Sequence, residues 1–210
     1  MKKTTLALAV EFILIFVGIP LVFYFEWVSL PKIPTLVFLT TFCVVALLKD
    51  KRFDRTVLWN YQYARAAIPK TVIRFHLVAI ALTAFTYFFF PELLFLFPKT
   101  RPVIWVIVMV FYPLLSALPQ EFIYRAFLFH RYQSLFTSPT RQILVSAVVF
   151  SLLHIMYDNW YAVVLSLVGG LLFSRTFHSS KSLFLVSLEH ALYGSYIFTV
   201  GLGHFFYEGF

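Results

Sequence analysis

Residues 103–130, VIWVIVMVFYPLLSALPQEFIYRAFLFH, decide the class of fold. The run is long enough to cross the hydrocarbon core of a bilayer, which takes about 20 apolar residues in a helix. It nevertheless carries Glu121 and Arg125 in its interior. An ionisable side chain at membrane depth is costly and is by default a candidate for a functional site. The segment therefore predicts a transmembrane helix that contributes to a polar site.

The whole chain has the composition of an integral membrane protein. Of its 210 residues, 61% are hydrophobic and 12% are charged, and its mean hydropathy is +0.86, whereas about 25% of the residues of a soluble domain are charged. Besides 103–130, apolar runs lie at 5–25, 34–48, 72–91, 141–157, 160–177 and 181–201. Together they predict an all-α, polytopic helical bundle of about seven transmembrane helices, with six to eight as the range, in one membrane domain over residues 1–210.

The N-terminal part, residues 1–102, is expected to supply the first helices and a surface segment. The first 25 residues resemble a signal peptide, but Glu11 interrupts the apolar core and no small-x-small cleavage site follows. They are therefore expected to remain as the first helix. Segment 56–70 combines aromatic residues with Arg65 and Lys70, which predicts an amphipathic stretch at the cytoplasmic surface.

The net charge of +8 reflects topology rather than nucleic-acid binding, because the basic residues gather between apolar runs and form no aromatic-interleaved face. With a cytoplasmic N-terminus and alternating spans, the outer side holds only Lys32, Lys99 and Arg101. The inner side holds the other fourteen basic residues: Lys2, Lys3, Lys49, Lys51, Arg52, Arg55, Arg65, Lys70, Arg74, Arg125, Arg131, Arg141, Arg175 and Lys181. This bias predicts an integral membrane protein with a cytoplasmic N-terminus. Cys43 is the single cysteine, which excludes an intrachain disulfide.

Three polar residues fall at similar depths in this topology. At a rise of about 1.5 Å per residue, Glu121 lies about 15 Å from the inner edge, His154 about 20 Å and His190 about 14 Å. The hydrocarbon core is about 30 Å thick. Three different helices therefore place these side chains near the middle of the membrane, where they are expected to meet. Two structural alternatives to a functional site are open. Glu121 and Arg125 are four residues apart and could form a pair that only stabilises their helix. The histidines could be interior residues without a catalytic role.

The three side chains suit hydrolysis by an activated water. A carboxylate accepts the proton of the water, one imidazole orients the water, and a second stabilises the oxyanion that forms at the scissile carbonyl. Glu121, His154 and His190 are also a possible zinc set with one open position, although the HExxH signature is absent. No cofactor is the leading expectation, with zinc as the alternative.

Three motifs in order carry a family resemblance: Glu-x-x-x-Arg at 121–125, Phe-x-x-x-His at 150–154 and a motif that begins with His190 and ends at Gly194. Residues 103–201 thereby resemble the catalytic core of the CPBP family, which comprises CAAX prenyl proteases of the Rce1 type and bacterial Abi, bacteriocin-processing proteins, and they look like its bacterial branch.

The resemblance implies an intramembrane endopeptidase acting on a membrane-associated or lipidated protein or peptide, and it assigns a role to each residue. Glu121 would activate water alongside His154, with Gln120 ordering that water. His190 would stabilise the oxyanion and Arg125 would hold Glu121, while Phe150 and Gly194 complete the motifs.

Two positions depart from the family pattern, which usually has Glu at the position of Gln120 and Asn at that of Gly194. Two interpretations are open. In one, the site hydrolyses peptides, and a backbone N–H or Ser195 replaces the missing Asn. In the other, proteolysis has been lost and the protein is a membrane scaffold, chaperone or immunity-type peptide-binding protein. A proton-coupled transporter would use similar buried groups, but the chain lacks repeated halves.

Overall fold

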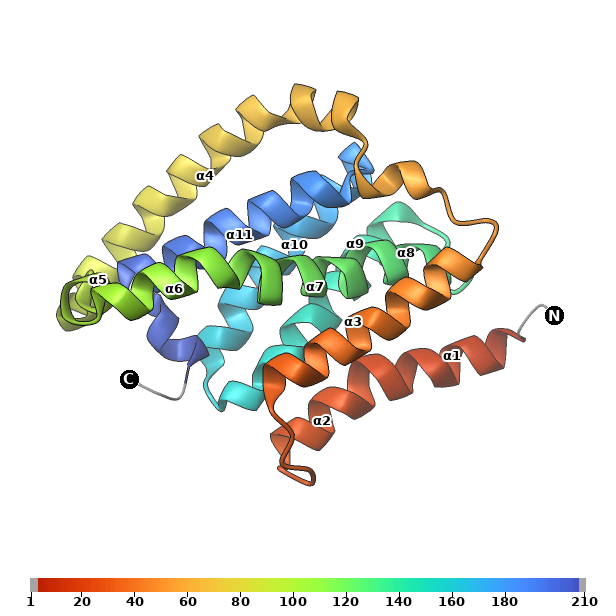
Figure 1. Cartoon of the computed structure of the whole chain (residues 1–210), viewed down its shortest axis with the longest axis horizontal. Coiled ribbons are helices and arrows are strands. Elements are labelled where there is room, and N and C mark those ends of the chain that lie inside the picture. The colour runs from red at the N-terminus through yellow and green to blue at the C-terminus, as the bar shows by residue number, and fades with distance from the viewer. Residues whose placement is uncertain (1–3, 208–210) are drawn as a thin grey trace.

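The computed structural model describes residues 4–207, and all regular secondary structure among them is helical. Seven helical stretches in this part are long and apolar enough to cross a membrane (Figure 1). They run over Thr5–Tyr24, Lys32–Lys49, Arg55–Phe89, Pro102–Arg131, Pro139–Tyr157, Trp160–Ser180 and Leu183–Val200. The predicted all-α membrane bundle is confirmed.

Several spans contain more than one helical segment. The first is built from α1 (Thr5–Ile13), the π-helical η1 (Leu14–Gly18) and α2 (Ile19–Tyr24). The second is α3 (Lys32–Lys49), and the third joins the short η2 (Arg55–Leu58) to α4 (Tyr61–Phe89). The turn η3 (Pro91–Leu93) and the short helix α5 (Leu96–Thr100) lead into the fourth span.

The fourth span alternates between α-helix and π-helix. Its parts are α6 (Pro102–Tyr112), η4 (Pro113–Ala117), α7 (Leu118–Glu121), η5 (Phe122–Phe127) and α8 (Leu128–Arg131). The last three spans are α9 (Pro139–Leu153) with η6 (His154–Tyr157), α10 (Trp160–Ser180) and α11 (Leu183–Val200), which is followed by η7 (Leu202–Phe206).

Polar caps fix where the last three spans begin. Ser138 accepts a hydrogen bond from the Arg141 backbone N–H at the start of α9, and Pro139 occupies the first turn. Asn159 caps α10 and Ser182 caps α11 in the same way. Side-chain oxygens of this kind satisfy N–H groups that have no partner within the helix. The local sequence therefore sets the depth at which the residues of these spans lie.

The bundle is organised around α10, which packs along both α9 and α11. Helix α4 lies over α11, and α3 packs against the broken fourth span on the other side (Figure 1). Large apolar side chains such as Phe38, Ile80 and Val103 point away from the bundle and are mostly exposed. Such a surface suits contact with lipid, while the polar residues lie between the inner helices.

Segment 56–70 is not a separate element, because from Tyr61 onward it forms the first turns of α4. This helix has 29 residues, or about 43 Å at 1.5 Å per residue, which exceeds the hydrocarbon thickness of about 30 Å. A helix of this length leaves room for its first turns, which carry Arg65 and Lys70, outside the apolar core of the membrane. The position of segment 56–70 at the cytoplasmic surface stays a prediction.

Gly170 allows α9 and α10 to approach closely. A Cβ atom at this position would lie 2.9 Å from the Ala147 Cα and 3.1 Å from the Ala147 carbonyl oxygen, both of which are backbone atoms. At the neighbouring Gly169, a Cβ would meet only the side chain of Phe173, at 3.2 Å. Backbone cannot yield as a side chain can, so position 170 should be the less tolerant of the two.

We expect Gly170→Ala to destabilise the protein by about 1–3 kcal/mol, since an extra methyl group must force two packed helices apart. Gly169→Ala is the matched control and should be neutral or slightly stabilising, because alanine favours the helix by about 0.5–1 kcal/mol over glycine. Thermal unfolding of the two detergent-solubilised variants measures the difference. Equal melting temperatures would contradict the role of Gly170 in helix packing.

Candidate active site

The two π-helical segments of the fourth span determine how Glu121 is presented. Both begin next to a proline-containing turn, with Pro113 starting η4 and Pro119 lying in α7 before η5. A proline has no N–H to donate and disturbs the preceding turn. Each π-helical segment also adds residues to the turn, which rotates the chain that follows it. Glu121 stands between them at the end of α7, facing α11.

The Glu121 carboxylate binds two partners in the centre of the bundle. The Nδ1–H of His190 donates to its Oε1 atom at 2.8 Å. Its Oε2 atom lies 3.0 Å from Nε of Arg125, within ion-pair distance but outside good hydrogen-bond geometry. Glu121 and Arg125 are both fully buried. The expected meeting of Glu121 and His190 is therefore present in the structure, from two spans 69 residues apart in sequence.

Two phenylalanine rings enclose the Arg125 guanidinium. Its Cζ atom lies 4.7 Å from the ring centre of Phe150 and 5.7 Å from that of Phe173. Its Nη2 also donates to the Gly170 carbonyl oxygen at 3.4 Å. Aromatic faces attract a cation, and more strongly when water is absent. Phe150, which belongs to the second motif, thereby helps to hold the cation that neutralises Glu121.

In each histidine, one ring nitrogen makes a hydrogen bond within the described part of the chain and the other does not. His154 Nδ1 donates to the Phe150 carbonyl oxygen at 2.8 Å, so its Nε2 carries a lone pair when the ring is neutral. His190 uses Nδ1 for Glu121, and its ring stacks on Phe173 at 4.6 Å between centroids. Within residues 4–207, neither Nε2 atom makes a hydrogen bond. Phe150 contacts both imidazoles, with ring centres at 4.9 and 5.6 Å.

A cavity of about 820 Å³ opens beside these histidines. Its polar lining includes Tyr112, Ser116, Gln120, His154 and His190, and Phe150 and Gly194 also line it. Glu121 and Arg125 do not line the cavity and lie behind the histidines. The remaining lining is mainly apolar, with residues of α4, α6, α10 and α11 such as Leu82, Ile104, Leu165 and Ile197.

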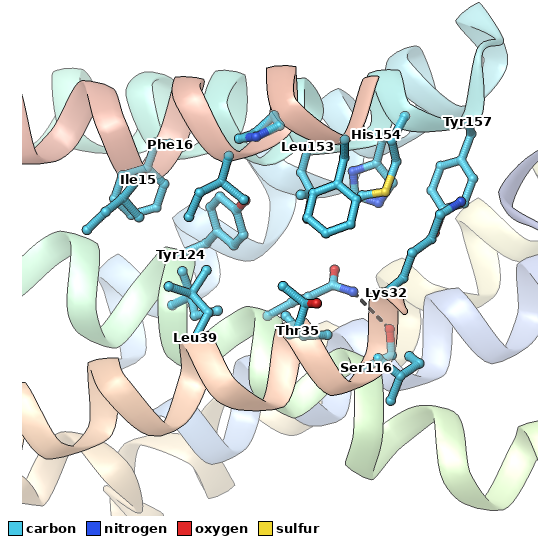
Figure 2. Close-up of a pocket in the computed structure, with 18 residues that line it drawn as sticks. Ile15, Phe16, Lys32, Thr35, Leu39, Ser116, Tyr124, Leu153, His154 and Tyr157 are labelled. Carbon is cyan, nitrogen blue, oxygen red and sulfur yellow. Dashed lines mark hydrogen bonds between the residues drawn. The ribbon is translucent and has the colours of Figure 1, made fainter. Parts of the chain in front are cut away.

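A smaller pocket of about 90 Å³ lies next to the cavity, between the first two spans and the fourth and fifth (Figure 2). It shares Gln120, Ser116 and His154 with the larger cavity. Gln120 Nε2 donates to Ser116 Oγ at 2.8 Å, the bond drawn in Figure 2. Its Oε1 atom is buried and has no hydrogen-bond partner within residues 4–207. Gln120 therefore presents an acceptor near His154.

Gly194 lies against the hydroxyl end of Tyr112. A Cβ atom at position 194 would be 2.0 Å from the Tyr112 hydroxyl oxygen and 2.3 Å from its Cζ atom. No residue with a side chain fits here while Tyr112 keeps this position. Ser195, considered as a replacement for the Asn of the family motif, does not line the cavity, and its carbonyl oxygen accepts a hydrogen bond from Thr199.

A second buried carboxylate, Glu189, belongs to a separate contact. It forms an ion pair with Arg74 of α4, whose Nη2 also donates to Thr176. Glu189 is absent from the lining of the cavity. The pair therefore joins α4 to α11 and does not add a second carboxylate to the site. Arg74 gave no signal in the sequence beyond its place among the basic residues, and Tyr112 gave none at all.

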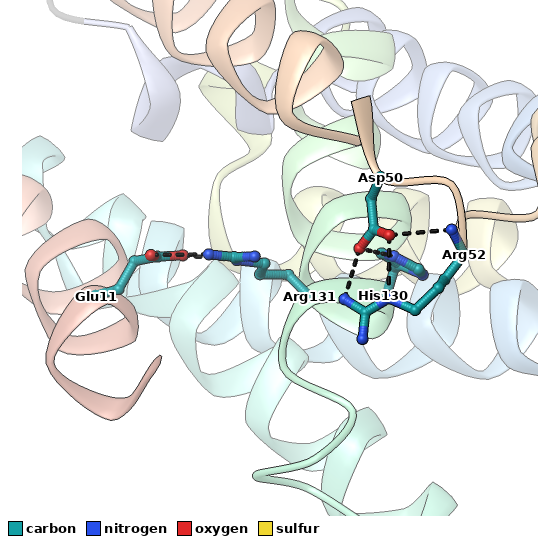
Figure 3. A network of polar contacts seen from close by, with 5 residues as sticks. All are labelled: Glu11, Asp50, Arg52, His130 and Arg131. Atoms are coloured by element: carbon teal, nitrogen blue, oxygen red, sulfur yellow. Dashed lines mark hydrogen bonds and ion pairs between the residues drawn. The ribbon is translucent and has the colours of Figure 1, made fainter. Parts of the chain in front are cut away.

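The polar cluster at the other ends of the spans is structural (Figure 3). Arg131 donates to both carboxylate oxygens of Glu11, at 2.8 and 3.1 Å, which ties the first span to the fourth. His130 Nε2 lies 3.1 Å from Asp50 Oδ2. Hydrogen bonds from the side chain and backbone N–H of Arg52, and then from His130, hold the pKa of Asp50 well below its usual range. None of these residues lines the cavity.

No group of three or more His, Cys, Asp or Glu residues within 4–207 is arranged to hold a metal ion. The proposed zinc ligands Glu121 and His190 are instead bonded to each other, and His154 Nδ1 is bonded to backbone. The carboxylate oxygens of Glu121 and both Nδ1 atoms are thus engaged, and within the described residues only the Nε2 atom of each histidine is open. The metal content of the protein is a prediction for measurement.

Comparison with known proteins identifies one family. Residues 101–196 match the family model described as type II CAAX prenyl endopeptidase Rce1-like. The match contains all three motifs, from Gln120 to Gly194, and confirms the resemblance read from them. No curated protein and no solved structure matches the chain. Residues 101–196, somewhat less than half of the chain, are thus similar to the Rce1-like type II CAAX prenyl endopeptidases, a family of proteases.

Proposed function

We propose that this protein is an intramembrane endopeptidase that hydrolyses a peptide bond in a membrane-associated or lipidated protein or peptide. The observation that carries the proposal is the 2.8 Å hydrogen bond between His190 and the buried Glu121 carboxylate, next to a cavity that His154 also lines. Such a constellation is expensive in a membrane. Its retention favours chemistry at the cavity over a purely structural pair.

The geometry suggests a division of labour in which His154 activates the water. Its Nδ1–H is fixed on backbone, so Nε2 of the neutral ring is the available base. Gln120 Oε1, which has no partner within residues 4–207, accepts the other hydrogen of the same water and orients it. The water oxygen attacks the scissile carbonyl carbon while its proton moves to His154 Nε2. That proton then passes to the leaving nitrogen as the C–N bond breaks.

Glu121 acts through His190 in this scheme, because it does not reach the cavity. Its carboxylate accepts the Nδ1–H bond and stabilises the positive charge of a doubly protonated imidazole. The Nε2–H of that ring donates to the carbonyl oxygen as negative charge develops there. Glu121 is thus a positioning residue, held in place by Arg125, and His190 and His154 are the catalytic residues.

The shape of the cavity supports an apolar substrate. Ligand sites for small molecules are typically about 300–1,000 Å³, and most of this 820 Å³ space is lined by aliphatic and aromatic side chains of α4, α6, α10 and α11. A lipid chain attached to the substrate, or a hydrophobic peptide segment, fits that lining. A prenylated C-terminal motif is one substrate of this chemistry.

We propose a cytoplasmic N-terminus on the basis of the Lys and Arg bias, and a bacterial inner membrane on the basis of the resemblance to the bacterial branch of the family. Lys2 and Lys3, which contribute to that bias, lie outside the described residues. The cavity reaches Pro31, Lys32, Tyr157 and Tyr207, at the ends of the spans opposite to the basic cluster around Arg131. In this orientation the cavity opens toward the outer half of the membrane, which would deliver the substrate from that side.

A peptide-binding role without hydrolysis is the second candidate. The observation that favours it is Gln120. An amide cannot act as a base on the water, whereas the carboxylate that the family pattern usually has at this position could. The same cavity and apolar lining would then hold a peptide without cleaving it. Variants of the site separate the two functions.

His154→Gln should lower the rate of cleavage of a lipidated peptide in proteoliposomes by about 10²–10⁴-fold, which is the usual contribution of general base catalysis. His190→Gln should do the same, whereas His204→Gln, at an exposed position outside the cavity, is the matched control and should behave as wild type. Circular dichroism and melting temperature establish that each variant is folded. Wild-type cleavage by folded His154→Gln and His190→Gln proteins would refute the hydrolase proposal.

Gln120→Glu should change cleavage by less than about tenfold, because His154 already accepts the proton of the water. Initial rates with the same lipidated peptide measure the change. An increase of about 10² or more would mean that the native protein lacks an effective base and would favour the binding role. Gln120→Ala removes the acceptor that orients the water, so this variant is expected to cleave the peptide more slowly than both wild type and Gln120→Glu.

Purified protein should contain far less than one zinc ion per chain, and cleavage should survive dialysis against a chelator. The reason is that His190 and Arg125 occupy the oxygens of Glu121, so that among these described side chains only the Nε2 atoms of His154 and His190 are open, fewer than the three protein ligands usual at a catalytic zinc. Elemental analysis by mass spectrometry measures the metal directly. A stoichiometric metal that is lost in the His154→Gln variant would instead assign the zinc set proposed from the sequence.

A further inference from the structure

The hydroxyl of Tyr112 occupies a place on α11 that a side chain at position 194 would otherwise fill. A Cβ there would lie 2.0 Å from the hydroxyl oxygen and 2.4 Å from Cε1 of the ring. The Tyr112 ring also meets His190 edge-on at 6.0 Å and Phe198 at 5.5 Å. His190, Gly194 and Phe198 follow one another at intervals of four residues on one face of α11. Tyr112 is therefore seated across the glycine, one turn from the proposed catalytic histidine.

The Tyr112 hydroxyl differs in its bonding from the two serine hydroxyls of the cavity. Ser116 accepts a hydrogen bond from Gln120, and Ser166 donates to the Val163 carbonyl oxygen. The Tyr112 hydroxyl makes no hydrogen bond to any other residue between 4 and 207, although its side chain lines the cavity. A hydroxyl without a partner in an apolar environment is unfavourable. It is thus ready to donate to an oxygen of a bound molecule.

The chemistry of the proposed reaction supplies such an oxygen. When water adds to the scissile carbonyl, the carbonyl oxygen gains negative charge and requires hydrogen-bond donors. Phenolic hydroxyls serve as oxyanion donors in enclosed apolar sites because they donate without carrying charge. Glu121 engages Nδ1 of His190, so Nε2 is the nitrogen of that ring that can donate. Tyr112 would stand beside it as a second donor, from a different span.

We propose that Tyr112 is a further catalytic residue, whose hydroxyl donates to the carbonyl oxygen together with His190 Nε2–H, and that Gly194 is required to seat it. This inference rests on the proposed hydrolase function. It explains why position 194 has no side chain, because the hydroxyl of Tyr112 from α6 occupies the space beside this glycine. The water, the proton path and the bond that breaks are those of the hydrolysis described above.

Tyr112→Phe tests the donor, because it removes only the hydroxyl. In full-length protein reconstituted in proteoliposomes with a farnesylated peptide, kcat should fall by about 10²–10³-fold, as it does when one oxyanion donor is removed. KM should stay within a few-fold of wild type, because the bond forms mainly in the transition state. Tyr196→Phe on α11 is the matched control: its hydroxyl contacts Thr83 outside the cavity, and cleavage should be unchanged.

Binding of a trifluoromethyl ketone analogue of the same peptide gives a second readout. Its hydrate resembles the tetrahedral intermediate, so Tyr112→Phe should weaken its binding by about as much as kcat falls, while the parent peptide binds equally well. Wild-type kcat and ketone affinity in Tyr112→Phe, with His154→Gln inactive, would overturn the role of Tyr112 and leave the hydrolase function standing. A wild-type protein that neither cleaves the peptide nor prefers the ketone would refute both.

Gly194→Ala examines the seat without touching Tyr112. Its methyl group must displace the hydroxyl, so kcat should fall about as far as in Tyr112→Phe. In a Tyr112→Ala background, where the ring is gone, Gly194→Ala should cost little more, because the two changes remove the same interaction. Fully additive losses in the double variant would contradict the coupling of these two residues.

Discussion

The contact of the Glu121 carboxylate with Arg125 and His190 joins the fourth and seventh spans at a depth where no water replaces a lost partner. Removing one member of a buried ion pair typically costs about 3–5 kcal/mol, because the other charge is left alone. The aromatic rings of Phe150 and Phe173 enclose the same cation from α9 and α10. Four spans are thereby tied to one charge pair, and the apolar packing around it must conform to that geometry.

The broken fourth span makes this contact possible without bringing the carboxylate into the cavity. A regular helix through Pro113 and Pro119 would lose hydrogen bonds and clash with the preceding turns. Pro113 begins the π-helical η4, Pro119 lies in α7 directly after it, and Glu121 at the end of α7 faces α11. Gln120, one residue earlier, faces the cavity instead. Adjacent residues therefore have different surroundings, with Glu121 in the interior of the bundle and Gln120 at the cavity.

Much of this arrangement could be predicted from the sequence, because the length of each apolar run and the positions of the flanking basic residues indicate where each helix crosses the membrane. Counting residues from the basic ends placed Glu121, His154 and His190 at similar depths, and the structure brings the first and last together. The i,i+4 spacing of Glu121 and Arg125 likewise predicted their pairing. Contacts set by helix rotation and packing could not be read in this way. The Tyr112–Gly194 contact joins positions 82 residues apart and depends on how α6 packs against α11, and the Arg74–Glu189 pair depends on how α4 lies over α11.

The electrostatics of the site give a reason for an amide at position 120. Glu121 and Arg125 neutralise each other, so a protonated His190 leaves one uncompensated positive charge beside the cavity. In a medium of low dielectric constant, that charge attracts a developing oxyanion far more strongly than it would in water. A carboxylate at position 120 would offset part of that positive charge. In the proposed mechanism, Gln120 would accept a hydrogen bond from the water without adding charge. The positive charge of His190 would then stay directed at the carbonyl oxygen, to which Tyr112 would also donate.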